Sequence, residues 1–144
     1  MSKESTPVSS IMTTNVKIAT EEETIQTVCK LMYENHIGSI VVVKRTIDGI
    51  NPIGIITERD IVHQIGSSEL FLVQAPIRQI MSTPLITIGA NSRVRDAVEI
   101  MQLKKIRRLP VIDNSGKMVG IITDKDVLKQ RYNNTKERKR NKKE

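Results

Sequence analysis

Apolar residues recur along this chain with the period of a helix, and they do so at equivalent places in its two halves. An i, i+3, i+4, i+7 spacing forms one face of an amphipathic helix. The spacing occurs at Ile25, Val28, Cys29 and Met32, and again at Val94, Ala97, Val98 and Met101. Each half therefore predicts a helix that packs one side against a sheet.

Short apolar runs surround both helical patterns and predict β-strands. Val16–Ile18 and Leu85–Ile88 come before the helices, and the runs that follow them are Ile40–Val43, Ile53–Ile56, Leu109–Ile112 and Met118–Ile122. Turn residues at Asp48-Gly49 and Asn114-Ser-Gly116 predict hairpins between the last two strands of each half. Each half thus predicts a β-α-β-β-α unit.

The two halves are copies of one another. Gly54-Ile-Ile-Thr-Glu-Arg-Asp60 and Gly120-Ile-Ile-Thr-Asp-Lys-Asp126 are nearly identical, and aligning Met12 with Met81 keeps the earlier apolar positions in register. The first copy carries three extra residues after Lys44, within a predicted turn. The chain is therefore an internal duplication.

One unit of about 55 residues can bury only a marginal core, so we expect the two to pack together through their sheet or helix faces. The predicted fold is α/β (α+β), with two pseudo-symmetric repeats packed through their sheets into one module. We expect repeat 1 at residues 8–66, a linker at 67–76, repeat 2 at 77–132 and a tail at 133–144. Leu70–Val73 is apolar enough to predict a short packed helix.

Composition narrows the class of protein. The sequence has no run of 18 apolar residues and no secretory leader pattern, which predicts a soluble cytoplasmic protein without a membrane span. Its one cysteine, Cys29, lies on an apolar helix face and is expected to be structural. His36 and His63 have no partners at metal-ligand spacing, so no metal site is expected.

Positive charge is concentrated at the C-terminus. Residues 129–144 carry a net charge of +6 of the total +7, and few of them are apolar, so we expect disorder beyond Asn134. The tail has two interpretations, a solubilising end or a sequence-independent arm that binds nucleic acid. Only Tyr132 lies near the cluster, so base-stacking platforms for single strands are lacking.

The repeated motif ends in a pattern with two meanings. Thr57-x-x-Asp60 and Thr123-x-x-Asp126 fit a helix N-cap, in which the hydroxyl and the carboxylate bond to backbone N–H groups. A strand that ends at a helix N-terminus also presents N–H groups and a positive dipole end to an anionic or polyhydroxylated ligand. Asp60 or Asp126 could there accept both hydroxyls of a ribose.

The duplicated G-h-h-T-x-x-D motif (h, apolar) follows a predicted hairpin, and a helix and a strand precede it. This arrangement resembles the CBS domain (cystathionine β-synthase domain), and two copies resemble a CBS pair, or Bateman module. The similarity covers about residues 8–131.

The resemblance implies a regulatory module whose clefts bind adenosine-containing molecules such as AMP, ADP, ATP or S-adenosylmethionine. It implies that Asp60 and Asp126 hold ribose hydroxyls and that Thr57 and Thr123 bond the ribose or α-phosphate region. The first strands would line the adenine pocket, and each cleft would combine the Asp of one repeat with the first strand of the other. The complete set of implied ligand-binding residues is Thr13, Val16, Lys17, Gly38, Ser39, Ile56, Thr57, Asp60, Ser82, Leu85, Ile86, Arg107, Arg108, Pro110, Ile122, Thr123 and Asp126.

The copies differ where a phosphate would lie. Gly38-Ser39 in the first copy corresponds to Arg107-Arg108 in the second, and family members often have basic side chains there. The arginines could pair bidentately with phosphate oxygens. Lys104 and Lys105 have an equally good interpretation as a solvated helix end.

Three functions follow from these observations. The first is a stand-alone, non-catalytic nucleotide sensor that needs no cofactor, forms a homodimer of CBS pairs and signals to an unknown regulated protein. The second is a nucleic-acid-associated dimer that uses the basic tail. The third is a structural dimer in which the Thr and Asp residues only cap helices.

Overall fold

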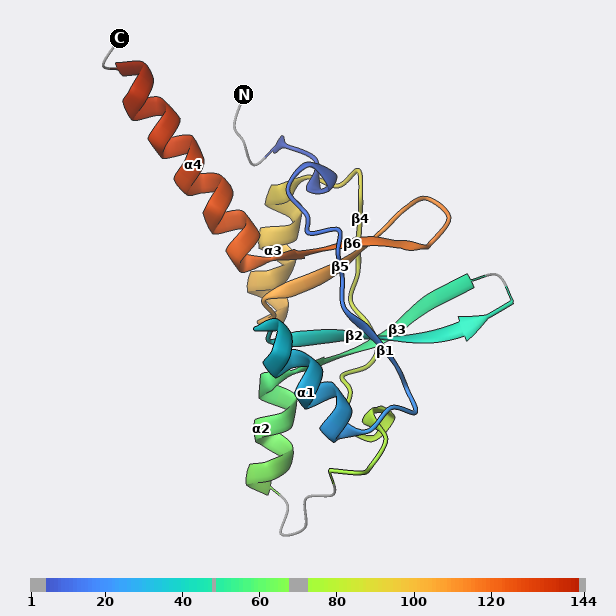
Figure 1. Cartoon of the computed structure of the whole chain (residues 1–144). Coiled ribbons are helices and arrows are strands. Elements are labelled where there is room, and N and C mark those ends of the chain that lie inside the picture. Colours follow the sequence, from blue (N-terminus) through green and yellow to red (C-terminus); the bar gives the residue numbers. More distant parts are fainter. Residues whose placement is uncertain (1–4, 48, 68–72, 143–144) are drawn as a thin grey trace. The chain divides into compact units, whose positions relative to one another are not determined.

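The computed structural model describes residues 5–47, 49–67 and 73–142. The chain forms two compact units (Figure 1). The central unit consists of Val16–Ile86, and the terminal unit combines the N-terminal segment, through Asn15, with the chain from Thr87 onward. Each unit therefore contains one repeat from its first strand onward and the segment that precedes the first strand of the other repeat.

The central unit is built around a three-stranded mixed sheet in the order β1-β2-β3. β1 is parallel to β2, and β2 is antiparallel to β3. Its elements are β1 (Ile18–Thr20), α1 (Ile25–Asn35), β2 (Ser39–Thr46), β3 (Gly49–Thr57), α2 (Glu58–Ser67) and the 3-10 turn η3 (Ile77–Gln79).

The terminal unit repeats this topology with a sheet in the order β4-β5-β6. Its elements are the 3-10 turn η2 (Val8–Ser10), β4 (Ile88–Gly89), α3 (Val94–Lys104), β5 (Arg108–Ile112), β6 (Met118–Thr123) and α4 (Asp124–Lys142). The predicted α/β class, with a three-stranded sheet and helices in each repeat, is confirmed.

Local chemistry explains where these elements begin and end. The Thr24 hydroxyl accepts the Thr27 N–H at 3.1 Å and starts α1, which ends where His36 adopts a left-handed φ of 53°. Gly116 has a φ of 84° in the hairpin of the terminal unit, a conformation that glycine adopts without strain. The predicted turn at Asp48-Gly49 lies in part outside the described residues.

The core of the central unit contains residues from both sides of the repeat boundary. Ile25, Val28 and Met32 of α1 pack with β-strand residues, and Ile77 from η3 is fully buried in the same cluster. In the terminal unit Val8 is likewise fully buried, and its N–H donates to Ser92 O at 2.8 Å. The bounds of the compact units therefore differ from the predicted repeats at 8–66 and 77–132, because η2 and η3 bury apolar side chains in the unit of the other repeat.

Two predictions need correction, and a third is not tested. The first strands are shorter than expected and begin at Ile18 and Ile88, because Val16 and Leu85 lie near the points where the chain passes from one unit to the other. Residues 133–142 are helical, not disordered, because they continue α4, which is anchored by buried Val127 and is rich in helix-forming Lys and Arg. The predicted helix at Leu70–Val73 lies largely outside the described residues.

Candidate functional site

The end of β3 and the start of α2 form a hydrogen-bonded cap around one carboxylate. The Thr57 N–H and hydroxyl donate to Asp60 Oδ2 at 2.9 and 3.1 Å. The Asp60 N–H donates in turn to the Thr57 hydroxyl at 3.3 Å. Both residues are half-buried. The capping role predicted for this pair is therefore present.

A third residue completes this arrangement from a distant part of the chain. The Ser82 hydroxyl donates to Asp60 Oδ1 at 2.9 Å, and Ser82 is itself exposed. Ser82 also exchanges backbone hydrogen bonds with Ile55 of β3, at 2.8 and 3.3 Å. Since Ser82 precedes the first strand of the second repeat, this contact joins segments of different repeats.

The terminal unit contains the same arrangement with Thr13 in the place of Ser82. The Thr123 N–H donates to Asp126 Oδ2 at 2.9 Å, and the Asp126 N–H donates to the Thr123 hydroxyl at 3.1 Å. The exposed Thr13 hydroxyl donates to Asp126 Oδ1 at 3.2 Å. The backbone of Thr13 pairs with Ile121 at 2.8 and 2.9 Å. We call the two arrangements the Asp60 site and the Asp126 site.

The first glycine of each repeated motif makes room for this crossing segment. A Cβ placed on Gly120 would lie 2.8 Å from Thr13 O and 2.6 Å from Met12 Sδ. A Cβ on Gly54 would lie 3.1 Å from Ser82 O and 2.9 Å from Met81 Sδ. The glycine is therefore needed for close approach of two backbones, and both of these positions are buried strand residues with ordinary φ values.

The start of the second strand lies beside each Thr residue. Ser39 pairs with Thr57, and Arg108 pairs with Thr123 at the same place in the other sheet. The Asp124 N–H donates to Arg107 O at 2.8 Å, as the Glu58 N–H does to Gly38 O at 3.1 Å. The backbones of the two arginines thus adjoin Thr123 and Asp124, whereas Gly38 and Ser39 occupy the equivalent positions beside Thr57 and Glu58.

Other predicted site residues have different surroundings. Ile56 and Ile122 are fully buried in the strands and Pro110 is also buried, so these three residues present almost no surface to a ligand. Val16 and Lys17 lie in the central unit, and Lys17 O accepts the Val41 N–H at 3.3 Å. Leu85 and Ile86 are half-buried and lie outside the strands.

Sequence reasoning missed two of the residues that shape these sites. Met12 and Met81 cover Gly120 and Gly54, yet they served only to align the repeats. The two methionines occupy equivalent positions before the first strands of the two repeats, and this equivalence could have indicated that they pack in the same way. Thr13 and Ser82 were predicted as pocket residues, but their hydrogen bonds to the carboxylates were not predicted.

The chemistry available at each site is binding through hydrogen bonds. A carboxylate has about four lone-pair positions. Asp60 accepts from three protein donors and retains room for about one ligand hydroxyl, whereas Asp126 accepts from two and retains room for about two. Burial raises the pKa of the Cys29 thiol, which disfavours a reactive thiolate. Among the described residues, no three His, Cys, Asp or Glu side chains gather as metal ligands would, and no helix could span a bilayer.

Comparison with known proteins identifies the repeats. The CBS domain model matches residues 8–67 and 77–133. An uncharacterized protein of Methanopyrus kandleri is 42% identical over 106 residues, which are 74% of this chain and 53% of that relative. The chain therefore spans about half the length of this relative.

Solved structures share the same fold. An uncharacterized conserved protein from Pyrococcus horikoshii matches with a TM-score of 0.78 at 28% identity, over 88% of this chain and 92% of that one. The CBS domain pair of protein MJ0100 matches with a TM-score of 0.76 at 25% identity, over 87% and 98% of the two chains. That structure is a complex with 5′-methylthioadenosine and S-adenosyl-L-methionine.

Proposed function

The chain belongs to the CBS domain family, and from this premise we propose that it is a regulatory module that binds an adenosine-containing ligand at the Asp60 site, the Asp126 site or both. Candidate ligands are AMP, ADP, ATP and S-adenosylmethionine. Binding would change the conformation of the module and thereby signal to a regulated partner. The role is one of binding, since Thr and Asp pairs at helix N-termini are suited to hold hydroxyls and phosphates.

The observation that carries this proposal is the triple arrangement of carboxylate, capping hydroxyl and crossing hydroxyl, which occurs once in each unit. In the central unit Asp60 bonds to Thr57 and to Ser82. A cap alone needs no donor from a distant segment, whereas a ligand site gains from a carboxylate held in one orientation. The adenosine compounds bound by the pair from MJ0100 support the same ligand class.

The two sites are proposed to differ in the charge that they accept. Arg107 and Arg108 adjoin Thr123 in the terminal unit, and guanidinium groups bind phosphate oxygens well. The Asp60 site has uncharged Gly38 and Ser39 in their place. The Asp126 site is therefore proposed to prefer a phosphorylated ligand, and the Asp60 site a ligand without phosphate.

We also propose that the module forms a homodimer. Tyr33 of α1 and Val62 and Ile65 of α2 are 82%, 66% and 54% exposed, and an apolar depression lined by Met32 and Ile61 lies between these helices. A second copy of the chain could bury these side chains. A monomeric mass for the wild type at micromolar concentration would contradict this part of the proposal.

Thermal unfolding with and without AMP, ATP or S-adenosylmethionine tests ligand binding, because a ligand that binds only the native state raises its stability. Asp60→Ala and Asp126→Ala each remove one site carboxylate. The matched control is Asp96→Ala, because Asp96 caps α3 by accepting the Arg93 N–H at 3.0 Å and belongs to neither site. Each ligand-induced shift is measured against the same variant without ligand, so the loss of a cap is separated from the loss of binding.

We expect the control to keep the full ligand-induced shift and at least one site variant to lose it. The variant that loses the shift assigns the ligand to its site. Equal shifts in all three variants would contradict a ligand role for the two carboxylates. The absence of a shift with every ligand in the folded wild type would contradict adenosine sensing itself.

A further inference from the structure

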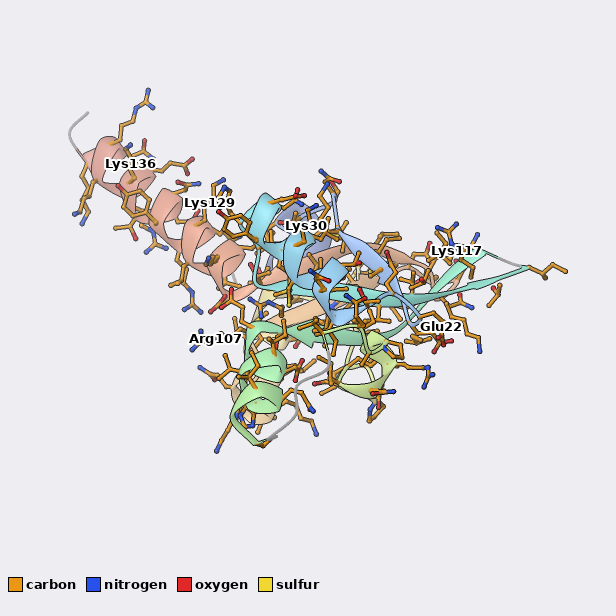
Figure 2. All side chains as sticks on the ribbon, turned by 60° about the horizontal axis from the view of Figure 1, so that its bottom comes forward. Glu22, Lys30, Arg107, Lys117, Lys129 and Lys136 are labelled. Atoms are coloured by element: carbon orange, nitrogen blue, oxygen red, sulfur yellow. The ribbon has the colours of Figure 1, made fainter. Side chains whose placement is uncertain are left out.

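The C-terminal part of α4 carries a charge pattern that the proposed ligand sites do not use. Residues 129–142 contain seven Lys or Arg residues and one acidic residue, Glu137. All seven cationic residues are exposed, and Figure 2 shows cationic side chains projecting on several sides of this helix. In Figure 1 the C-terminal end of α4 extends away from the rest of the terminal unit.

Six of the seven cationic residues form two ridges along the helix. Successive helical residues are about 100° apart, so positions i, i+7 and i+11 lie within about 40° of one another. The first ridge consists of Lys129, Lys136 and Arg140, and the second of Arg131, Arg138 and Lys142. The ridges lie on opposite sides of α4, and each is about 17 Å long at 1.5 Å per residue.

We propose that this segment of α4 binds duplex DNA by lying in the major groove, where one ridge contacts the phosphates of each strand. An α-helix about 10–12 Å across fits a B-DNA major groove about 12 Å wide. Cations on opposite sides of the helix then face both walls of the groove. The binding is independent of base sequence, since it gains from phosphate contacts and counterion release.

The same residues disfavour other polyanions. Tyr132 is the only aromatic or aliphatic residue in 129–142, so this segment lacks both the apolar face that inserts into a membrane and the stacking surfaces of a single-strand binder. The major groove of A-form RNA is too deep and narrow to admit a helix. Duplex DNA is therefore the polyanion that the two opposed ridges fit.

The test is fluorescence anisotropy of a labelled random-sequence DNA duplex with the full-length protein over a series of salt concentrations. With six phosphates neutralised, the slope of log K against log salt should be about −5. A variant that combines Lys129→Gln, Lys136→Gln and Arg140→Gln should have a slope that is less steep by about 3. The same change of the three residues of the second ridge should have the same effect. The matched control, Lys44→Gln, Arg45→Gln and Lys117→Gln, removes equal charge from exposed strand and turn positions and should leave the slope unchanged.

A second variant tests the helix itself. Thr135→Pro keeps every charge but interrupts α4 in the middle of both ridges, and buried Val127 lies well before the break. We expect this variant to remain folded and to lose affinity for the duplex. The proposal would be overturned if the Thr135→Pro variant kept the affinity of the wild type, or if the control variant lost as much affinity as the ridge variants. It would also be overturned if single-stranded DNA, duplex RNA or anionic vesicles bound as well as the DNA duplex, or if the wild type did not bind the duplex at about 50 mM salt. Ligand-induced thermal shifts should be the same in all of these variants, so failure of this proposal is distinguishable from failure of adenosine sensing.

Discussion

Replacing Gly120 by alanine should destabilise the protein through one close contact. The new Cβ would lie 2.8 Å from Thr13 O and 2.6 Å from Met12 Sδ. The thioether can rotate away, but the carbonyl is backbone, and it is held by the 2.8 and 2.9 Å hydrogen bonds between Thr13 and Ile121. The strand segment must therefore move, and its pairing must weaken.

The magnitude follows from the two contributions. Overpacking of a close contact costs about 1–3 kcal/mol, and weakening two backbone hydrogen bonds adds about 1 kcal/mol. We expect a loss of about 2–4 kcal/mol in the free energy of unfolding. A domain of this size then unfolds roughly 4–16 °C lower.

Urea denaturation followed by circular dichroism measures this loss directly. Gly54→Ala should cost less than Gly120→Ala, because its Cβ would lie at the wider distances of 2.9 Å from Met81 Sδ and 3.1 Å from Ser82 O. Gly66→Ala is the control, since its Cβ would meet nothing within 4 Å and α2 gains up to about 1 kcal/mol of helix propensity. A Gly120→Ala variant within about 0.5 kcal/mol of wild type would refute the reasoning that a rigid backbone crossing requires this glycine.

Three further predictions concern the caps, the hairpin and the arginines. Thr123→Val removes the hydroxyl that accepts the Asp126 N–H and should lower the free energy of unfolding by about 1 kcal/mol in urea denaturation; an unchanged value would contradict the cap. The Ser115 hydroxyl and the Lys117 N–H lower the pKa of Asp113, so its ionised form stabilises the fold above the ordinary value of 3.8, and this contribution is lost as the pH falls through the lower folded pKa. An NMR titration should show Asp113 below 3.8, and Ser115→Ala should bring it closer to that value; a midpoint at or above 3.8 in the wild type would contradict this. Combining Arg107→Gln with Arg108→Gln should weaken AMP more than adenosine in calorimetric titrations, and equal losses would contradict a phosphate contact.

Much of the local structure could be predicted from the residues. Helical and strand periods gave the elements of each repeat, because a segment that buries one face must repeat its apolar residues at the period of its own backbone. The helix patterns beginning at Ile25 and Val94 became α1 and α3, and the Thr57 and Asp60 cap formed as expected. The duplication indicated the CBS family, which the comparison confirms.

The sequence could not define the compact units or the partners of the site carboxylates. Ser82 bonds to Asp60 across 22 residues and Thr13 bonds to Asp126 across 113, and no local period encodes such contacts. Burial of Val8 and Ile77 brings these segments into the units of the opposite repeats. The tail is helical although its composition predicted disorder, because capping and burial at the N-terminal end of α4 allow polar residues to continue the helix. The sequence by itself thus determined the elements through short-range periodicity and the family through its duplicated motif. The tertiary structure alone decided which distant hydroxyl completes each carboxylate site, since that depends on which unit buries the apolar residues next to each crossing segment.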